Sequence, residues 1–308
     1  MNLANQKVLV TGASGFIGSH LCQRLVATGA VVHAVSRIPR SSLFENLHWW
    51  AADLTRIDRV RQLFESIRPD IIYHLASYVM GAPNLEHVLP TFHANLQTSV
   101  NLLTVAAEKG CRRLVLTGSL AEPELGKGEH FPSAPYAAAK WASSGYGRMF
   151  HALYGVPVVL VRVYMVYGPA QRDLSKLIPY TTVSLLQGKN PKVTSGERLI
   201  DWIYVSDVVD AYLALAEVAG VEGSTLEIGS GKLVPIREIV NKVAEIVDSG
   251  VDVYFGALPD RPMEPIRAAD VLQTYQKIGW EPATALSPGL ERTIHWYREH
   301  LSDLIPGT

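Results

Sequence analysis

The sequence predicts an α/β protein with a doubly wound parallel sheet and a smaller C-terminal α/β lobe. In the first part of the chain, short runs of uninterrupted apolar residues alternate with stretches whose apolar residues recur at the helical period. Strands that are apolar throughout are typical of parallel sheets covered by helices on both faces, joined by right-handed crossovers. After residue 168, prolines and polar residues interrupt this alternation, which indicates a second lobe.

The first part of the chain supplies the expected sheet. Its predicted strands are residues 7–12, 31–37, 70–77, 113–119 and 157–168. The helices expected between them are residues 16–29, 58–68, 94–109 and 136–154. Because each strand is short and each intervening stretch carries a helical period, successive strand–helix units account for the whole region.

The later part mixes both kinds of element. Residues 177–186 are expected to form a helix, residues 199–220 a strand, turn and helix, and residues 224–231 a strand. Residues 234–247 and 288–300 complete the chain as amphipathic helices. We assign residues 1–168 and a returning segment of about 198–230 to the first domain, and residues 169–197 and 231–308 to the lobe.

Composition narrows the function class. The chain has 308 residues, 48% of them hydrophobic, and a formal net charge of −1. This charge offers no basic field for nucleic acid or an anionic membrane surface. The two cysteines, Cys22 and Cys111, argue against a disulfide scaffold, and no metal site is expected. The N-terminus lacks an apolar signal core and no window is long enough to span a membrane, so we expect a cytoplasmic protein.

Three glycines stand where the first strand meets the first helix: Gly12, Gly15 and Gly18. A tight turn alone could explain them. In this context, however, glycines let backbone amides approach a pyrophosphate, and the helix N-terminus adds a positive end. The third glycine allows the helix to pack closely on the strand. Since the strand–turn–helix context is the one that the fingerprint requires, we predict a dinucleotide site.

The tip of the second strand carries Ser36 and Arg37, with Arg40 close by. An acidic residue at this place bonds the ribose hydroxyls of NAD. An arginine instead attracts the 2′-phosphate of NADP, and its plane can stack on adenine. We therefore expect NADP(H) in preference to NAD(H). NAD(H) stays open as the alternative, with both arginines as solvated loop charges.

Tyr136 and Lys140 lie four residues apart on an expected helix and so share one face. A tyrosine and lysine at this spacing are common on helices, but here they follow the fourth strand of a dinucleotide fold. An ammonium near a phenol favours the phenolate, which makes Tyr136 a candidate general acid in carbonyl reduction. Ser119, at the end of that strand, could donate a hydrogen bond to the developing alkoxide.

Taken together, these motifs resemble a known family. The segments TGASGFIGSHL, ADL (52–54), HLAS (74–77), Asn95, the strand end at Ser119, YAAAK, RVYMVYGP and the run 201–207 occur in family order. The chain resembles the extended short-chain dehydrogenases/reductases, in the NAD-dependent epimerase/dehydratase branch that acts on nucleotide sugars. The resemblance covers nearly the whole chain. It implies a Rossmann domain, a substrate-binding lobe, and Ser119, Tyr136 and Lys140 as the catalytic triad.

The resemblance also implies the residues around the ligands. Asp53 and Leu54 would meet adenine, although Asp53 also suits a helix N-cap. The full set expected at the cofactor is Gly12, Ser14, Gly15, Phe16, Ile17, Gly18, Ser36, Arg37, Arg40, Asp53, Leu54, Leu75, Ala76, Ser77, Asn95, Thr117, Tyr136, Lys140, Tyr164 and Val166. The set expected at the substrate is Met165, Arg172, Arg198 and Arg261.

The chain departs from the family at several positions. Leu120 and Ala121 stand where the 4,6-dehydratases place an Asp-Glu pair, so the acid and base that dehydration needs are missing there. Glu122 follows; it could be a local substitute, but we expect a solvated loop residue. Met165 replaces a usual asparagine and Ile200 an arginine that often meets phosphate. Arg261 matches the family's diphosphate-binding arginine, and Arg172 and Arg198 are hypothetical replacements for the charge missing at Ile200.

From these observations we expect NADPH-dependent reduction of a keto group on a nucleotide-linked 4-keto-6-deoxy sugar, in deoxysugar biosynthesis, with Tyr136 as proton donor. Two alternatives stay open. One is a nucleotide-sugar epimerase with tightly held NAD, and the other is a reductase of a non-nucleotide ketone, which the apolar Met165 and Ile200 favour. The resemblance also implies a homodimer formed through the helices that begin at Ala94 and Tyr136.

Overall fold

A computed structural model describes residues 3–42, 44–123, 131–260 and 264–305. The chain divides into two compact units, which we describe separately. Unit 1 comprises residues 1–163, 209–227 and 272–280, and unit 2 comprises residues 164–208, 228–271 and 281–308. None of the described helices is long and apolar enough to cross a membrane.

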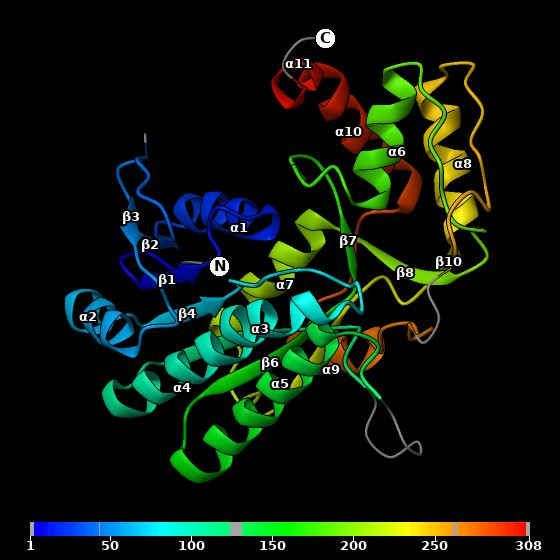
Figure 1. Cartoon of the computed structure of the whole chain (residues 1–308). Helices are drawn as coiled ribbons and strands as arrows, with labels where there is room; N and C mark the ends of the chain where they lie inside the picture. Colours follow the sequence, from blue (N-terminus) through cyan, green and yellow to red (C-terminus); the bar gives the residue numbers. More distant parts are fainter. Residues whose placement is uncertain (1–2, 43, 124–130, 261–263, 306–308) are drawn as a thin grey trace. The chain divides into compact units, whose positions relative to one another are not determined.

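A seven-stranded sheet forms the centre of unit 1 (Figure 1). Its strands, in sheet order, are β3 (Leu47–Ala51), β2 (Val31–Ser36), β1 (Lys7–Thr11), β4 (Ile71–His74), β5 (Arg113–Ser119), β6 (Val158–Val163) and β9 (Thr225–Ile228). The five pairings from β3 to β6 are parallel. The order reverses between β1 and β4, which is the switch point where doubly wound sheets bind ligands. The predicted fold class is confirmed.

Helices cover this sheet. They are α1 (Phe16–Ala27), α2 (Ile57–Ile67), η1 (Leu85–His87), α3 (Val88–Thr91), the π-helical η2 (Phe92–Gln97), α4 (Thr98–Lys109), α5 (Pro135–Tyr154), residues 209–217 of α7 (Val205–Glu217) and most of α9 (Val271–Ile278). The helices α2, α4 and α5 lie side by side below the sheet in Figure 1. Their apolar stripes, including Leu63, Leu103 and Phe150, pack on Leu9 and Leu114 of the strands.

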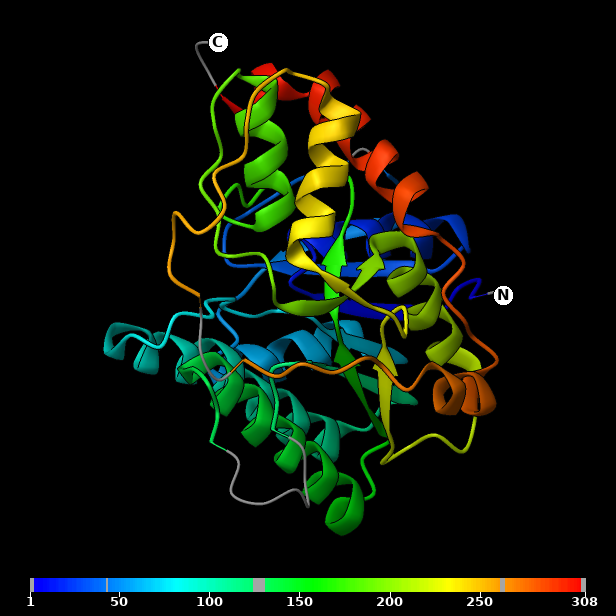
Figure 2. The ribbon, with the colours of Figure 1, turned by 90° about the vertical axis from the view of Figure 1, so that its right-hand side faces the viewer.

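Unit 2 has a three-stranded mixed sheet of β7 (Met165–Tyr167), β8 (Leu199–Tyr204) and β10 (Leu233–Pro235). Figure 2 shows three helices of this unit side by side, α6 (Leu177–Leu186), α8 (Ile236–Val247) and α10 (Leu286–Glu299). The short α11 (Leu301–Leu304) follows. Ile200, Ile239 and Ile294 belong to the apolar core of this unit.

The structure differs from the predicted elements at several places. The strands β3 and β10 and the helices η1, α3, α9 and α11 were not predicted. Residues 157–168, predicted as one strand, form two strands in different sheets, because β6 pairs with β5 whereas β7 pairs with β8. That pairing also explains why unit 2 begins at Tyr164 and includes β8, whereas the sequence analysis placed the boundary at residue 168 and began the returning segment at about 198.

Candidate active site

The glycine turn between β1 and α1 is built by close backbone approaches. Gly12 has a φ of +68°, and a Cβ added there would lie 2.6 Å from the backbone nitrogen of Ala76. A Cβ at Gly18 would lie 2.9 Å from the Cα of Ala13. Gly15 is the N-cap of α1 and has no side chain to accept from the first amides of the helix. These amides and the positive helix end fit a pyrophosphate.

Hydrogen bonds from neighbouring side chains hold segment 75–77 against the glycine turn. The Thr11 hydroxyl accepts from the Ala76 N–H at 3.2 Å and bonds Nδ1 of the buried His74 at 2.7 Å. Burial lowers the pKa of His74 to about 3, so the ring is neutral. Asn95 accepts from the Ser77 hydroxyl at 3.1 Å and from the Tyr78 N–H at 2.6 Å. The side chain of Asn95, expected at the cofactor, therefore shapes the loop that faces Gly12.

The expected adenosine end lies at the carboxyl ends of β2 and β3. The Ser36 hydroxyl is buried and donates to the Ile38 carbonyl at 2.5 Å, so it closes a local turn. Arg37 is exposed, and the Arg40 guanidinium lies 5.6 Å from the centre of the Trp49 ring. Asp53 accepts from both the N–H and the hydroxyl of Thr55. The side chain of Leu54, also expected at adenine, is packed in the core.

Ser119, Tyr136 and Lys140 come together at the carboxyl end of β5. The Ser119 hydroxyl accepts from the Ala121 N–H at 3.2 Å and forms a hydrogen bond with Tyr136. The buried Lys140 ammonium donates to the Thr117 carbonyl at 2.8 Å and lies 5.9 Å from the centre of the Tyr136 ring. Pro135 starts α5 and suits a first helical position, so both reactive groups stand on its first two turns.

The ionisation of this pair departs from the sequence-based expectation. Burial raises the pKa of Tyr136 above its ordinary value, whereas its hydrogen bond with Ser119 lowers it. Burial also lowers the pKa of Lys140 to about 8, and the charge of Glu122 opposes that shift. We expected the ammonium to make the phenol easier to ionise. That expectation is corrected, because burial sets the pKa of Tyr136 in this arrangement and Lys140 bonds the Thr117 carbonyl.

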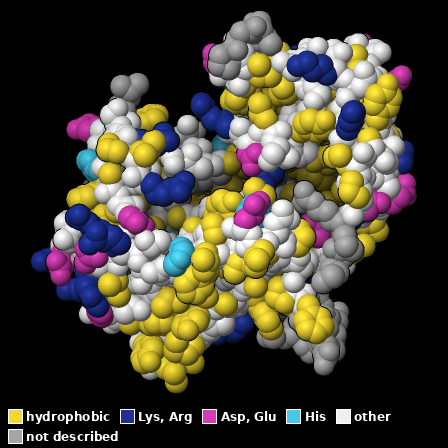
Figure 3. All heavy atoms as spheres, viewed as in Figure 1, with side chains coloured by type: hydrophobic (Ala, Val, Ile, Leu, Met, Phe, Trp, Pro, Cys, Tyr) yellow, Lys and Arg dark blue, Asp and Glu magenta, His cyan; other side chains and the backbone are white. Residues whose placement is uncertain are grey.

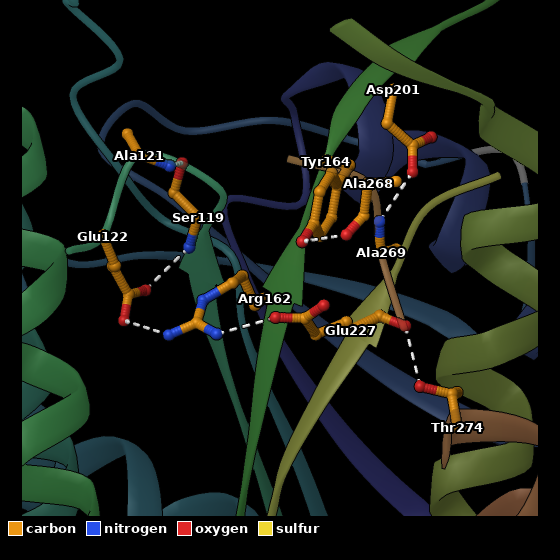
Figure 4. Close-up of polar contacts among 10 residues, drawn as sticks. All are labelled: Ser119, Ala121, Glu122, Arg162, Tyr164, Asp201, Glu227, Ala268, Ala269 and Thr274. Atoms are coloured by element: carbon orange, nitrogen blue, oxygen red, sulfur yellow. Dashed lines mark hydrogen bonds and ion pairs between the residues drawn. The ribbon is translucent and has the colours of Figure 1, made fainter. Parts of the chain in front are cut away.

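Unit 2 carries the residues predicted at the nicotinamide and the substrate. Tyr164 is buried and donates its hydroxyl to the Ala268 carbonyl at 3.2 Å (Figure 4). Arg198 forms an ion pair with Glu264, and Arg172 is exposed. The predicted Arg261 lies outside the described residues. The positions of the remaining expected residues are Met165 and Val166, half-buried on β7, and Ser14, Phe16 and Ile17, at the start of α1.

Ile200 belongs to the core of unit 2, with only 5% of its surface exposed. Its apolar side chain therefore fills that core. Asp201, the next residue on β8, is the polar group that sequence reasoning missed. The Asp201 carboxylate is buried and accepts from the N–H groups of Ser230 and Gly231, and from that of Ala269 as Figure 4 shows. These bonds tie two loops to the strand. Its neighbours in sequence are apolar, which is the signal that could have marked it as buried.

Glu122 was expected in a solvated loop, and that expectation is wrong. Its side chain is 2% exposed, and Oε1 accepts from the Ser119 N–H at 2.8 Å. Tyr212 of α7 was also missed, although its hydroxyl bonds that of Thr117 at 2.8 Å. Tyr212 reaches β5 from a segment far away in the sequence, whereas Glu122 folds back onto the strand that precedes it.

The chain is similar to known proteins along nearly its whole length. Residues 8–229 match the model of the NAD dependent epimerase/dehydratase family. A UDP-glucose 4-epimerase of Mycolicibacterium smegmatis is 30% identical over 95% of this chain and 98% of that protein. A dTDP-glucose 4,6-dehydratase of Haemophilus influenzae is 27% identical over 94% of this chain and 97% of that protein.

Two solved structures of epimerases share the fold of this chain. The UDP-glucose 4-epimerase of Thermus thermophilus, solved in complex with NAD, is 27% identical and superposes with a TM-score of 0.83 over 95% of this chain and 99% of that one. The UDP-glucose 4-epimerase of Thermotoga maritima, solved with UDP-glucose, shares the fold with a TM-score of 0.86 at 24% identity, over 96% and 100% of the two chains.

Proposed function

The chain belongs to the NAD-dependent epimerase/dehydratase family, and from this premise we propose that it is a nucleotide-sugar epimerase that holds NAD through each catalytic cycle. Curated relatives that match along nearly their whole length include 4-epimerases of UDP-sugars. The same chemistry was the alternative to a reductase in the sequence analysis. The similar epimerases now give it more support than the reductase has.

Within unit 1, the glycine turn and the adjoining segment 75–77 would bind the dinucleotide. A nicotinamide held by these residues would supply reversible hydride transfer to and from the sugar carbon. Tyr136 takes the hydroxyl proton in the first half and gives it back in the second. Ser119 donates a hydrogen bond to the reacting oxygen.

The observation that carries this proposal is the arrangement of Tyr136 and Ser119, bonded to each other beside the Lys140 ammonium at the carboxyl edge of the sheet. The hydrogen bond from Ser119 stabilises a charge on the phenolic oxygen, so the phenol can exchange its proton in either direction. A reversible proton exchange suits epimerisation, in which oxidation and reduction alternate.

Dehydration is not part of the proposal. Leu120 and Ala121 replace the acidic pair of the dehydratases, and they supply no proton donor or acceptor. Glu122 does not substitute for that pair, because its carboxylate is buried and bonded to the Ser119 N–H. Positions 120 to 122 therefore do not supply the added acid and base that removal of water requires.

The test is turnover without added reductant. The purified chain is incubated with UDP-glucose, UDP-galactose, UDP-glucuronate and their N-acetylated analogues, and the products are separated by chromatography. We expect interconversion of a 4-epimer pair with no net consumption of cofactor, and oxidised nicotinamide released when the protein is denatured. Failure of every pair, combined with stoichiometric NADPH oxidation by a keto-sugar nucleotide, would replace this proposal by the reductase.

That reductase, acting on a nucleotide-linked 4-keto-6-deoxy sugar, is the second candidate, and one observation favours it. The end of β2 carries Arg37 and no carboxylate, and Arg40 lies over Trp49 on the neighbouring strand. Both cations are placed to attract a 2′-phosphate. Titration of the protein with NADPH and NADH decides this point, since tighter NADH binding would remove the argument for NADP(H). The sequence analysis cited the apolar Ile200 in favour of a non-nucleotide ketone as the substrate. Ile200 lies in the core of unit 2, so it no longer supports that substrate.

We also propose that the protein is a homodimer. Exposed apolar side chains of unit 1 include Leu85, Leu89 and Phe92 before α4, and Tyr146 and Leu153 on α5. Figure 3 shows hydrophobic side chains gathered over α3 and α5 on this face. An apolar surface of this kind is typical of an interface between subunits. Sedimentation velocity tests it, and a monomer at micromolar concentration would contradict it.

A further inference from the structure

Glu122 is a buried carboxylate for which the proposed mechanism has no use so far. It lies just past the end of β5, and two hydrogen bonds join it to Ser119. Oε1 accepts from the Ser119 N–H at 2.8 Å, and the Glu122 N–H donates to the Ser119 carbonyl at 3.1 Å (Figure 4). The backbone and the side chain of Glu122 thus close the turn on which the Ser119 hydroxyl stands.

The space for this carboxylate is built into the strand. Gly118 precedes Ser119, and a Cβ added at residue 118 would overlap Oε1 of Glu122 and lie 3.2 Å from the Val161 carbonyl oxygen. The φ of Gly118 is not one of the positive values found elsewhere in the described residues, so a side chain there would displace the Glu122 carboxylate without straining the backbone. The glycine and the glutamate therefore form one arrangement, in which the carboxylate folds back over the strand end.

Glu122 is also one end of a row of alternating charges. Its Oε2 lies 4.0 Å from Nη2 of Arg162 on β6, and Nη1 of Arg162 lies 2.8 Å from the Glu227 carboxylate on β9. The Thr274 hydroxyl donates to the Glu227 carbonyl at 2.8 Å. The exposed fraction of the Arg162 and Glu227 side chains is 17% each, against 2% for Glu122. Glu122 is thus the most deeply buried charge of the row.

The row ends beside the reacting pair. The buried Lys140 ammonium donates to the carbonyl of Thr117, two residues before Ser119, and the Glu122 charge favours the protonated form of this lysine. The same charge disfavours the phenolate of Tyr136. Removal of one negative charge from so buried a group of ions leaves the neighbouring cations less balanced. Both Lys140 and Tyr136 should therefore lose their protons at lower pH without it.

We propose that Glu122 is a positioning residue of the active site, which fixes the Ser119 turn through the Ser119 N–H and balances the Lys140 ammonium with its charge. This assignment rests on the proposed function, because Ser119, Tyr136 and Lys140 enter it as the reacting groups. If Glu122 only held the Ser119 turn in place, its hydrogen bond to Ser119 would be sufficient. An effect of the Glu122 charge on the pKa of Lys140 distinguishes a positioning residue of the active site from such a structural residue.

Two substitutions separate the hydrogen bond from the charge. Glu122→Gln keeps an oxygen that can accept from the Ser119 N–H but removes the negative charge. Glu122→Asp keeps the charge but shortens the side chain, so the bond to Ser119 is lost. Glu222→Gln is the matched control, since Glu222 is a carboxylate of the same unit that pairs with Arg113 and has no contact with Ser119.

The primary readout needs no substrate. Protein labelled with ¹³C at the lysine Cε is titrated by NMR, and the Lys140 signal is assigned by its loss in Lys140→Met. In the wild type we expect a midpoint near 8, the lowered pKa of Lys140. Glu122→Gln should move it downward by roughly half a pH unit or more. Glu122→Asp and Glu222→Gln should leave it within about a tenth of that shift.

The kinetic readout uses the sugar pair that the wild type interconverts. Glu122→Gln should displace the whole pH profile of kcat to lower pH, whereas Glu122→Asp should lower kcat roughly tenfold at every pH. An unchanged Lys140 midpoint in folded Glu122→Gln would overturn the proposal. If that variant fails to fold, Glu122→Met, which also removes the charge and keeps a side chain of similar size, must show the same downward shift. Since the titration uses no sugar, a chain without epimerase activity leaves this test intact.

Discussion

Gly12→Ala tests the glycine turn most sharply, because the structure shows which backbone atoms the added methyl group would contact. Its Cβ would lie 2.6 Å from the Ala76 nitrogen and 2.7 Å from the Leu75 carbonyl carbon, both of them backbone atoms. Ordinary contact begins at 3.4 Å, so the turn and segment 75–76 must separate by about 0.8 Å. The φ of +68° adds backbone strain for a residue with a side chain.

The expected cost follows from these two effects. Overpacking costs about 1–3 kcal/mol and the left-handed backbone about 1–2 kcal/mol. We therefore expect Gly12→Ala to lower the free energy of unfolding by about 2–5 kcal/mol. We also expect NAD affinity to fall at least tenfold, since about 1.4 kcal/mol of lost binding energy suffices for that factor. Isothermal titration calorimetry with NAD and NADH measures the affinity, and scanning calorimetry measures the stability.

Gly145→Ala is the matched control. Gly145 lies inside α5, and no atom outside its own helix backbone and chain neighbours lies within 4 Å of a Cβ added there. A helix-interior glycine is less stable than alanine by about 0.5–1 kcal/mol, so this variant should be slightly stabilised and bind NAD normally. Wild-type affinity and unfolding temperature in Gly12→Ala would refute the account of the turn.

Three further predictions follow from single side chains. Arg37→Ala should lower the ratio of NADPH to NADH affinity roughly tenfold in titrations of the purified protein, and an unchanged ratio would show that Arg37 does not meet a 2′-phosphate. His74→Gln should flatten the dependence of stability on pH. Burial lowers the pKa of His74 from 6.5 to about 3, so the unfolded chain alone takes up this proton as the pH falls through that window, and wild-type stability declines there. Urea denaturation between pH 4 and 7 measures the slope in both proteins, which should differ. Leu89→Asp should shift sedimentation from dimer to monomer with the fold intact, and an unchanged dimer would place the interface elsewhere.

The central sheet could be predicted because each of its inner strands is marked by an apolar run within one short segment. Val8 to Val10 and Ile71 to Tyr73 are fully buried, as their uninterrupted apolar runs indicated. The edge strand β3 carries no such run. Its residues, Leu47 to Ala51, are all half-buried or exposed and include His48, so the sequence does not distinguish it from a loop. An edge strand covered on one side only loses the signal that marks its central neighbours.

The run from Pro157 to Gly168 shows a second kind of limit. Its apolar residues correctly predict extended chain, but they carry no sign that the strand changes sheets at Tyr164. The change depends on the distant β8, whose residues Trp202 to Tyr204 pair with Met165 to Tyr167. Pairing partners far apart in the sequence are not encoded in either segment alone.

The candidate site divides in the same way. The glycines, the tyrosine and the lysine were found because their spacing along one turn or one helix carries their chemistry. Glu122 was misjudged, because Pro123 and a polar stretch follow it and suggest solvent. Its burial depends on Arg162 from β6 and on the absence of a side chain at Gly118. The contact with Arg162 is long-range and is not visible in the segment around Ser119, whereas Gly118 lies in that segment.

The most direct test of the account is Tyr136→Phe, assayed on the sugar pair that the wild type interconverts. The variant removes the phenolic oxygen that exchanges the proton and leaves the ring in place. We predict that kcat falls by roughly 10²–10⁴-fold, while the dissociation constant for NAD changes by less than about threefold. Turnover within a few-fold of wild type would contradict the central claim that Tyr136 exchanges the proton of the reacting hydroxyl.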